Sequence, residues 1–88
     1  MKLQVDHSEK GGKFFYEDQD KIIGELTYFK EDENTIHLPH TYVDPAYRHH
    51  GLARKLVDAV VSFANERSYT MRPTCSYIQH VLTRTKQQ

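Results

Sequence analysis

Tyr47-Arg48-His49-His50-Gly51-Leu52-Ala53 is the stretch that decides how this chain is organised. Asp44-Pro45, just before it, is a turn signal. After it, apolar residues recur at helical spacing along one side of Leu52 to Arg67, which predicts a long helix with one face toward a core. The stretch therefore joins an extended segment to the N-terminus of the principal helix.

The N-terminus of that helix has the features of an anion-binding site. Its first backbone N–H groups have no partner inside the helix, and the helix dipole makes this end partly positive. Gly51 lets a pyrophosphate approach the backbone, so we expect the N–H groups from His49 to Ala53 to surround it, with Arg48 and Arg54 adding charge. An ordinary helix start that contains a glycine is the alternative. The stretch is not a Walker loop, since no G-K-[ST] follows, and its single glycine does not make a dinucleotide fingerprint.

Four segments before the helix predict β-strands, because they are rich in β-branched and aromatic residues or alternate between apolar and polar side chains. Short turns join them, so antiparallel hairpins are expected. The segments are Lys2–His7, Lys13–Glu17, Lys21–Lys30 and Thr35–Val43.

Alternation along the last two segments assigns their side chains to faces of the sheet. One face of the third segment is predicted to carry Ile22, Gly24, Leu26 and Tyr28, and the other Ile23, Glu25, Thr27 and Phe29. One side of the fourth segment is predicted to carry Ile36, Leu38, His40 and Tyr42.

The end of the chain predicts one more strand and a short helix. Ser68 is expected to end the long helix, and Tyr69 to Cys75 to form a fifth strand. A strand–helix–strand connection of this length implies parallel pairing and a right-handed crossover. Ser76 and Gln79 have the spacing of a capping box, which opens a helix through about Thr83. The fold class expected is α/β (α+β), a mostly antiparallel five-stranded mixed sheet with one long and one short helix.

Length and charge limit the function. Eighty-eight residues make one domain, residues 1–88. The net charge is zero, which argues against a general nucleic-acid binder. Residues 1–47 hold five Lys against ten Asp or Glu, and residues 48–88 hold seven Lys or Arg against two, so the balances are −5 and +5. The basic half suits an anionic phosphate ligand. The acidic half either attracts a cationic amine or is an ordinary solvated surface.

Cysteine and histidine usage exclude several kinds of site. Cys75 is the only cysteine, so no intramolecular disulfide and no multi-cysteine zinc site is expected. The histidines lack metal-site spacing, and we expect no metal. Nothing at the N-terminus resembles a signal peptide and no apolar run has membrane-spanning length, so we expect a cytoplasmic protein that does not bind a membrane. We also expect a monomer or a weak dimer.

Pro39 lies in the middle of the fourth predicted strand. Proline has no N–H for a β-ladder and belongs at an edge or a bulge. If the fourth and fifth strands separate near Pro39, they leave a slot of unpaired backbone groups in which an amide-bearing ligand pairs like an added strand. The alternative is that Pro39 only marks an edge strand.

Cys75 and His40 are the candidate reactive side chains. Cys75 falls at a strand end just before a capped helix, whose N-terminus would favour the thiolate. A buried cysteine with only a packing role is the alternative. His40 precedes the predicted slot, where an imidazole can take a proton from a thiol or an amine, although a histidine in this position is also a common structural residue.

Two stretches together resemble the GNAT N-acetyltransferases. Val43 to Leu56, with its R-x-x-G-x-A spacing, is similar to the central acyl-coenzyme A motif of that superfamily, and Cys75-Ser76-Tyr77-Ile78-Gln79 resembles its minimal single-domain group. The resemblance covers roughly Leu38 to Leu82. Compared with the larger family, the chain lacks the usual helices between the first two strands and the usual C-terminal strand pair. In the family these parts often shape the acceptor pocket.

The resemblance implies a GNAT-like fold and an acetyl-CoA-dependent N-acetyltransferase with an amine acceptor. By this resemblance the strand would pair with pantetheine through Tyr42 and Val43, and the backbone from Arg48 to Ala53, which includes His49, His50, Gly51 and Leu52, would hold the pyrophosphate beside Arg54. Cys75 and His40 correspond to the suspected catalytic pair of the minimal group.

Two mechanisms and a second function remain open at this point. In direct transfer, His40 removes the proton of the attacking amine while N–H groups of the fourth strand polarise the carbonyl. In the covalent route, Cys75 takes the acetyl group first. The alternative function is a non-catalytic CoA-binding sensor or interaction module.

Overall fold

One five-stranded sheet forms the framework of residues 2–86, the part of the chain that the computed structural model describes. Strands β1 to β4 are antiparallel neighbours, and β5 lies parallel to β4, in the order β1-β2-β3-β4-β5. The strands are β1 (Leu3–Ser8), β2 (Gly11–Asp18), β3 (Lys21–Lys30), β4 (Thr35–Val43) and β5 (Thr70–Pro73), and the helices are the 3₁₀ helix η1 (Pro45–His50), α1 (Leu52–Arg67) and α2 (Ser76–Lys86). The predicted fold class is confirmed.

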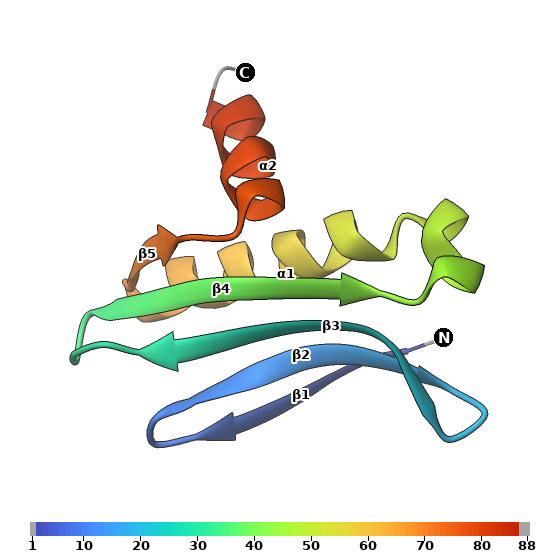
Figure 1. The fold of residues 1–88 in the computed structure, drawn as a ribbon. Helices are drawn as coiled ribbons and strands as arrows, with labels where there is room; N and C mark the ends of the chain where they lie inside the picture. The colour runs from blue at the N-terminus through green and yellow to red at the C-terminus, as the bar shows by residue number, and fades with distance from the viewer. Residues whose placement is uncertain (1, 87–88) are drawn as a thin grey trace.

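The two layers of the molecule are the sheet and α1, which lies across one face of it, while α2 stands beside β4 and β5 (Figure 1). Apolar side chains of α1 and of the inner sheet face form one core, which α2 extends with Ile78 and Val81. Leu52 and Leu56 of α1 pack over Gly24 on β3, where a Cβ would lie 3.5 to 3.7 Å from their side chains, which is ordinary van der Waals contact. None of the helices in the described residues is long and apolar enough to cross a bilayer.

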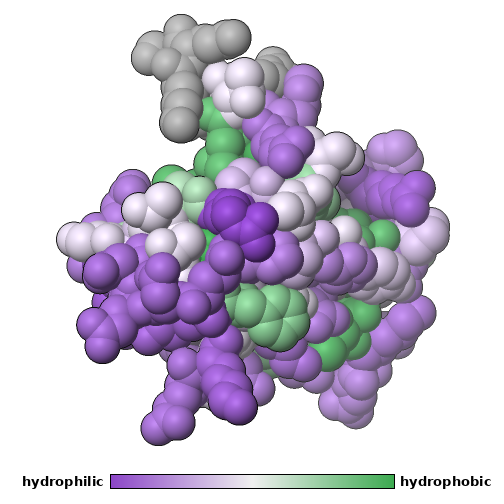
Figure 2. Space-filling view, turned by 60° about the vertical axis from the view of Figure 1, so that its left-hand side comes forward, coloured by the Kyte–Doolittle hydropathy of each residue, from purple (hydrophilic) through white to green (hydrophobic). Residues whose placement is uncertain are grey.

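The outer face of the sheet, opposite α1, carries no helix in the described part of the chain. Cross-strand register gives this face three rows of side chains. The rows are Gln4-Phe15-Glu25-Tyr42, then Asp6-Lys13-Thr27-His40, then Ser8-Gly11-Phe29-His37-Arg72. Figure 2, which brings the β1–β2 and β3–β4 turns forward, shows a mainly hydrophilic surface with hydrophobic side chains in separate spots.

A bulge in β4 corrects the predicted faces of that strand. Thr27 pairs with His40 but Phe29 pairs with His37, so two residues of β4, Leu38 and Pro39, oppose one residue of β3. The extra residue reverses the alternation. Leu38 is therefore buried against α1, whereas His40 and Tyr42 lie on the outer face. The prediction that His40 and Tyr42 share a side with Ile36 and Leu38 is wrong, because alternation was carried unchanged through Pro39.

A second irregularity corrects the start of β3. The register shifts between Tyr16 and Glu17, so that Gly24 pairs with Tyr16 and Ile22 with Glu17. Ile23 is left as the extra residue and is fully buried, although alternation placed it on the face of Glu25. A buried isoleucine at a bulge gains apolar contacts that a regular pleat would not give it.

The short turns also differ in detail from the sequence reading. Gly11 and Gly12 lie in the turn before the second predicted strand, Lys13–Glu17, but in the structure they begin β2. A Cβ on either would lie within about 2.3 Å of a backbone oxygen of a neighbouring strand, so both positions require glycine. Gln19 and Asp20 both have positive φ, as a two-residue type I′ hairpin requires.

The two helix ends at the C-terminal side gave one correct and one wrong prediction. Ser68 ends α1 in the left-handed conformation, with its N–H donating to carbonyls of the last turn, as expected of a helix end. The capping box at Ser76 is not formed. Gln79 instead donates from its side-chain amide to the carbonyl of Pro73 at 2.8 Å and from its backbone N–H to Cys75 at 3.0 Å. These bonds hold the turn between β5 and α2.

Candidate functional site

A cavity of about 410 Å³ lies where the end of β4, the N-terminus of α1 and the first turn of α2 meet. It opens on the α1 side of the sheet edge, because Thr41 and Val43 face that side after the bulge. Its lining residues are Thr41, Val43, Arg48, Gly51, Ala53, Arg54 and Tyr77. A strand edge, a helix N-terminus and two arginines thus surround one space.

Gly51 forms the junction between η1 and α1. Its φ of 69° and ψ of 23° are left-handed values, which glycine adopts without strain. No heavy atom lies within 4 Å of the position that a Cβ would occupy, so this side of the backbone is open. No side-chain cap covers the N-terminus of α1, whose first N–H groups are therefore accessible to an anion.

Thr41 carries a buried hydroxyl without a hydrogen-bond partner. Its Oγ1 is inaccessible to solvent and makes no hydrogen bond, and the residue lines the cavity. Buried polar groups in native proteins are nearly always paired, so an orphaned hydroxyl at a cavity wall marks a place where a ligand polar group fits. The open backbone at Gly51 and the orphaned Thr41 hydroxyl both suit a ligand with amides at one end and phosphates at the other.

Two side-chain links fix the η1 turn against the β2–β3 hairpin. Asp44 is only 7% exposed, accepts from the N–H of Ala46 at 2.9 Å, and pairs with Lys21 Nζ at 2.8 Å. Tyr47 donates its hydroxyl to Asp18 Oδ2 at 2.7 Å. Both links hold the backbone that leads into Gly51.

These links also shift ionisation equilibria. The bonds from Lys21 and from the N–H of Ala46 lower the pKa of Asp44, and the Asp44 carboxylate in turn raises the pKa of Lys21. The bond to Asp18, together with burial, raises the pKa of the Tyr47 hydroxyl. At neutral pH the ion pair is therefore fully charged and the Tyr47 hydroxyl keeps its proton.

The predicted slot between β4 and β5 is present. The two strands pair only from Thr35–Thr70 to Leu38–Pro73. The N–H groups of Thr74 and Cys75 then both donate to the single carbonyl of Leu38, at 3.1 and 3.3 Å. From Pro39 to Val43 the β5-side edge of β4 has no strand partner among the described residues.

Five of the nine residues predicted to hold the acyl donor line the cavity, namely Val43, Arg48, Gly51, Ala53 and Arg54. Arg54 also pairs with Asp58 one helical turn further on, at 3.2 Å. The side chains of the other four are not in the lining. Leu52 is buried in the core, His49 and His50 are exposed, and Tyr42 lies on the outer face.

Cys75 and His40 lie at the slot in different surroundings. Cys75 is partly buried and packs against the core. His40 is exposed on the outer face, in the row of Thr27. The bulge thus directs the imidazole away from the cavity and toward the uncovered side of the sheet.

Sequence reading missed several residues that shape the site. Thr41 was overlooked because the bulge that turns it inward has no direct sequence signal beyond Pro39. Tyr77 belongs to the motif that begins at Cys75, and that motif gives no sign that its side chain lines the cavity. Lys21 and Asp18 lie far from Asp44 and Tyr47 in sequence, and only the hairpin position brings them together.

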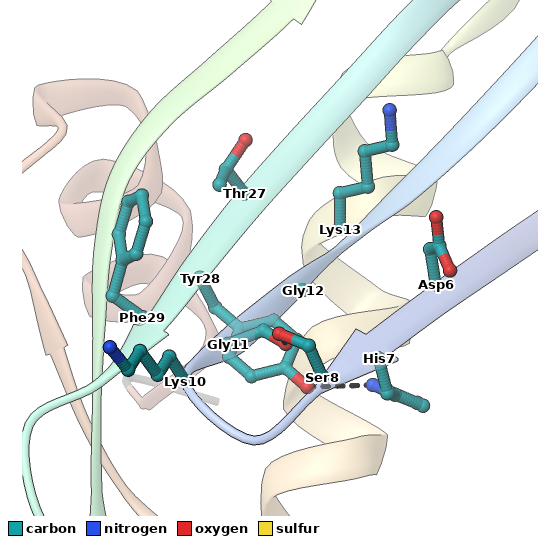
Figure 3. A pocket seen from close by; sticks show the side chains of 10 residues that line it. All are labelled: Asp6, His7, Ser8, Lys10, Gly11, Gly12, Lys13, Thr27, Tyr28 and Phe29. Carbon is teal, nitrogen blue, oxygen red and sulfur yellow. Dashed lines mark hydrogen bonds between the residues drawn. The ribbon is translucent and has the colours of Figure 1, made fainter.

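A second cavity, of about 330 Å³, lies at the other end of the sheet around the β1–β2 turn (Figure 3). His7 stacks on Phe63 with ring centroids 4.8 Å apart, and a hydrogen bond of 2.6 Å joins its Nδ1 to the Tyr28 hydroxyl. Burial raises the pKa of that hydroxyl. No helix N-terminus borders this cavity, so it does not share the anion-binding features of the first.

Comparison with known proteins assigns the family. A family model described as GCN5-related N-acetyl-transferase matches residues 13–88. The chain belongs to the GCN5-related N-acetyltransferase family. It is thus an acyltransferase of the GNAT type, as the sequence resemblance implied.

Individual relatives agree with this GNAT assignment. The chain is 33% identical over 81 residues to Protein NATD1 of Danio rerio, a match that covers 89% of this chain and 72% of the relative. A GCN5-like protein from Staphylococcus aureus, solved by NMR, is 30% identical with a TM-score of 0.73 over 97% of this chain and 82% of its own.

A more distant GNAT structure was solved with its acyl donor. A GNAT family acetyltransferase from Elizabethkingia anophelis, with acetyl-CoA bound, has a TM-score of 0.66 at 18% identity over 88% of this chain and 53% of its own. At that identity the likeness concerns the fold.

Proposed function

We propose that this protein transfers an acetyl group from acetyl-CoA to an amine acceptor, with the donor in the cavity between β4, α1 and α2. The observation that carries the proposal is the coincidence, in one cavity, of the open backbone at Gly51 and the orphaned hydroxyl of Thr41. The family's chemistry and the acetyl-CoA-bound neighbour support the same assignment.

Each part of the cavity has a role in holding the donor. The N–H groups at the start of α1 bind the pyrophosphate, and Arg48 and Arg54 add positive charge. The unpaired edge of β4, near Tyr42 and Val43, pairs with the pantetheine amides as a neighbouring strand would. Thr41 supplies a hydroxyl at the same wall. Tyr77 packs across the cavity from α2.

Direct transfer uses the two sides of the slot separately. The acceptor nitrogen attacks the thioester carbonyl carbon, the C–N bond forms, and the C–S bond breaks with the electron pair leaving on sulfur. His40 accepts the proton of the attacking amine from the outer face, and the proton returns to the CoA thiolate through solvent. N–H groups of β4 stabilise the oxyanion.

A covalent route uses Cys75 as the first acceptor. Its thiolate would displace the CoA thiolate, and the amine would then attack the acetyl-cysteine. We expect intact-protein mass spectrometry after acetyl-CoA treatment to detect an acetyl adduct that is absent from Cys75→Ala. Full amine acetylation by Cys75→Ala would exclude this route and leave direct transfer.

Two measurements test the function itself. CoA is expected to raise the melting temperature, because a ligand that binds the folded state stabilises it by mass action. A panel of amines is then screened for steady-state release of CoA thiol. No thermal shift would contradict the binding site, whereas a shift without turnover for any amine would contradict catalysis.

We expect a cytoplasmic protein, because a single free thiol suits a reducing compartment.

A further inference from the structure

The geometry points to an acceptor site for an alkyl diamine on the outer face of the sheet, with Glu25 and Tyr42 holding one ammonium group while the other amine reacts beside His40. This inference rests on the proposed acetyl transfer and names its substrate class. It concerns the side of the slot opposite the donor cavity.

The acceptor side follows from the bulge at Pro39. Thr41 and Val43 face the donor cavity, and the intervening and preceding side chains, Tyr42 and His40, face the uncovered side. An acceptor that reaches the slot from the outer face meets His40 without displacing the donor. No described helix covers this approach.

Glu25 provides the negative charge at this face. It lies directly opposite Tyr42 on β4 and Phe15 on β2, so an aromatic side chain flanks it on each side. The carboxylate makes no hydrogen bond or ion pair with any described residue, and Tyr42 is 39% exposed. A carboxylate beside an exposed aromatic ring is a favourable place for an alkylammonium group.

The charges around Glu25 also suit a cation. Glu17 shares the outer face of β2 and accepts a hydrogen bond from Gln4 at 2.9 Å. Lys13 is the opposing charge, and its ammonium already lies 5.0 Å from the centre of the Phe15 ring. This face therefore binds an alkylammonium of the chain itself on one side of Glu25. On the other side, Lys21 is near enough to interact electrostatically with Tyr42, but its ammonium is paired with Asp44, and no described cation is stacked on the Tyr42 ring.

The spacing of Tyr42 and His40 selects the length of the acceptor. Residues two apart on a strand face are about 7 Å apart. An extended chain advances about 1.2 Å per bond, so about four or five methylene groups connect a nitrogen held at Glu25 to one beside His40. A monoamine, or a lysine side chain within a peptide, lacks the second charge at that distance.

The test compares matched amines on the full chain. Steady-state release of CoA thiol is measured with 1,4-diaminobutane and 1,5-diaminopentane, and with n-butylamine and n-pentylamine, which lack the second nitrogen. We expect the diamines to have a kcat/KM roughly 3- to 10-fold higher, as for one exposed ion pair with a cation–π contact. Equal or higher kcat/KM for the monoamines overturns the inference.

Two surface variants have opposite expected effects on the diamines. Glu25→Gln is expected to remove the diamine preference by raising KM for the diamines. Lys13→Gln removes the competing ammonium and increases the preference. Glu17 is a carboxylate on the same face that already accepts a hydrogen bond from Gln4. Glu17→Gln is therefore the matched control and is expected to keep the diamine preference. A merely structural effect would not reverse in sign between the Glu25 and Lys13 variants.

The outcome separates this inference from the function on which it rests. A CoA thermal shift equal to that of the natural chain establishes that each variant is folded with an intact donor site. If CoA binds and amines turn over, but Glu25→Gln keeps the diamine preference, the diamine site is wrong and the transferase proposal stands. If CoA neither binds nor is released with any amine, both are overturned.

Discussion

Gly51 combines two properties that no other residue type combines at this position. Its backbone is left-handed, and the space beside its missing side chain is empty. The first property makes glycine the least strained choice, and the second keeps the N-terminus of α1 open. A substitution at position 51 can therefore affect both the stability of the fold and the binding of an anion at the start of α1.

Replacing Gly51 by Asp or by Asn separates these two effects. Asn and Asp are similar in size and both tolerate the left-handed conformation better than most residues. Like charges about 4 Å apart repel by about 1 to 4 kcal/mol at protein surfaces, or roughly 5- to 1000-fold in Kd. We expect Gly51→Asp to lose CoA binding, as measured by calorimetric titration, and Gly51→Asn to weaken it much less. Equal affinities in the two folded variants would contradict a phosphate at Gly51.

Asp44 gives a pH-dependent prediction at the same turn. Because its pKa is lowered in the folded state, the stability it contributes is present at neutral pH and is lost as the pH falls through the folded-state pKa. Asp44→Asn keeps an acceptor for Ala46 but not the pair with Lys21. In urea unfolding we expect the natural chain to be more stable than the variant at pH 7 and the difference to disappear at strongly acidic pH. A difference that is constant with pH would show that the ion pair contributes nothing.

At the scale of the elements, β4 determines the site. The strand pairs on both sides until Leu38 and on one side afterwards, and the bulge at Pro39 changes its faces at the same place. One irregularity therefore opens the slot, turns Thr41 and Val43 toward the cavity in which we propose that the donor binds, and exposes His40 and Tyr42. The rest of the sheet supplies a rigid support for that short segment.

The end of α1 offers a stability test. Ser68 has a φ of 58°, a left-handed conformation that a side chain disfavours. Ser68→Gly is expected to raise the free energy of unfolding by about 0.5 to 1 kcal/mol, because glycine adopts this conformation without the Cβ penalty. Urea denaturation measures the effect. The neighbouring exposed Asn65→Gly, inside the helix, is the control and is expected to destabilise slightly, by about 0.3 kcal/mol.

Much of this fold could be read from the sequence, and the errors share one cause. The bounds of β3, β4 and α1 follow from strong periodicity and clear end signals, and the structure confirms them. Local periodicity does not report a change of register, which depends on the partner strand. Ile23, His40 and Tyr42 were therefore assigned to the wrong faces, and Thr41 was missed. The open backbone at Gly51, where we propose that the donor binds, could be predicted because the residues around it are contiguous in sequence.

At the scale of the whole molecule, one helix and one sheet face provide nearly all of the core. Leu56 is fully buried in the middle of α1 and contacts the site of Gly24. Leu56→Ala is expected to cost about 2 to 5 kcal/mol, a large part of the roughly 5 to 15 kcal/mol that stabilises a typical domain. Chemical denaturation measures this loss, and the exposed Lys55→Ala is the control.

Ligand binding should partly compensate for that loss. CoA at about 100 times its Kd is expected to add about 2.7 kcal/mol to the natural chain and to any variant with an intact cavity. The melting temperature of Leu56→Ala should therefore rise with CoA concentration. If CoA stabilises neither chain, the nucleotide does not bind the native fold.

The extra residue in β4 has a consequence for how this protein can diversify. Downstream of Pro39, the odd-numbered residues Thr41 and Val43 line the cavity proposed for the donor, and the even-numbered His40 and Tyr42 lie on the opposite face. Substitutions at positions 40 and 42 can therefore change which acceptor binds at the outer face, while positions 41 and 43 continue to line the cavity proposed for acetyl-CoA. A mutant library that varies only positions 40 and 42 would sample new acceptor amines without changing the residues proposed to bind acetyl-CoA.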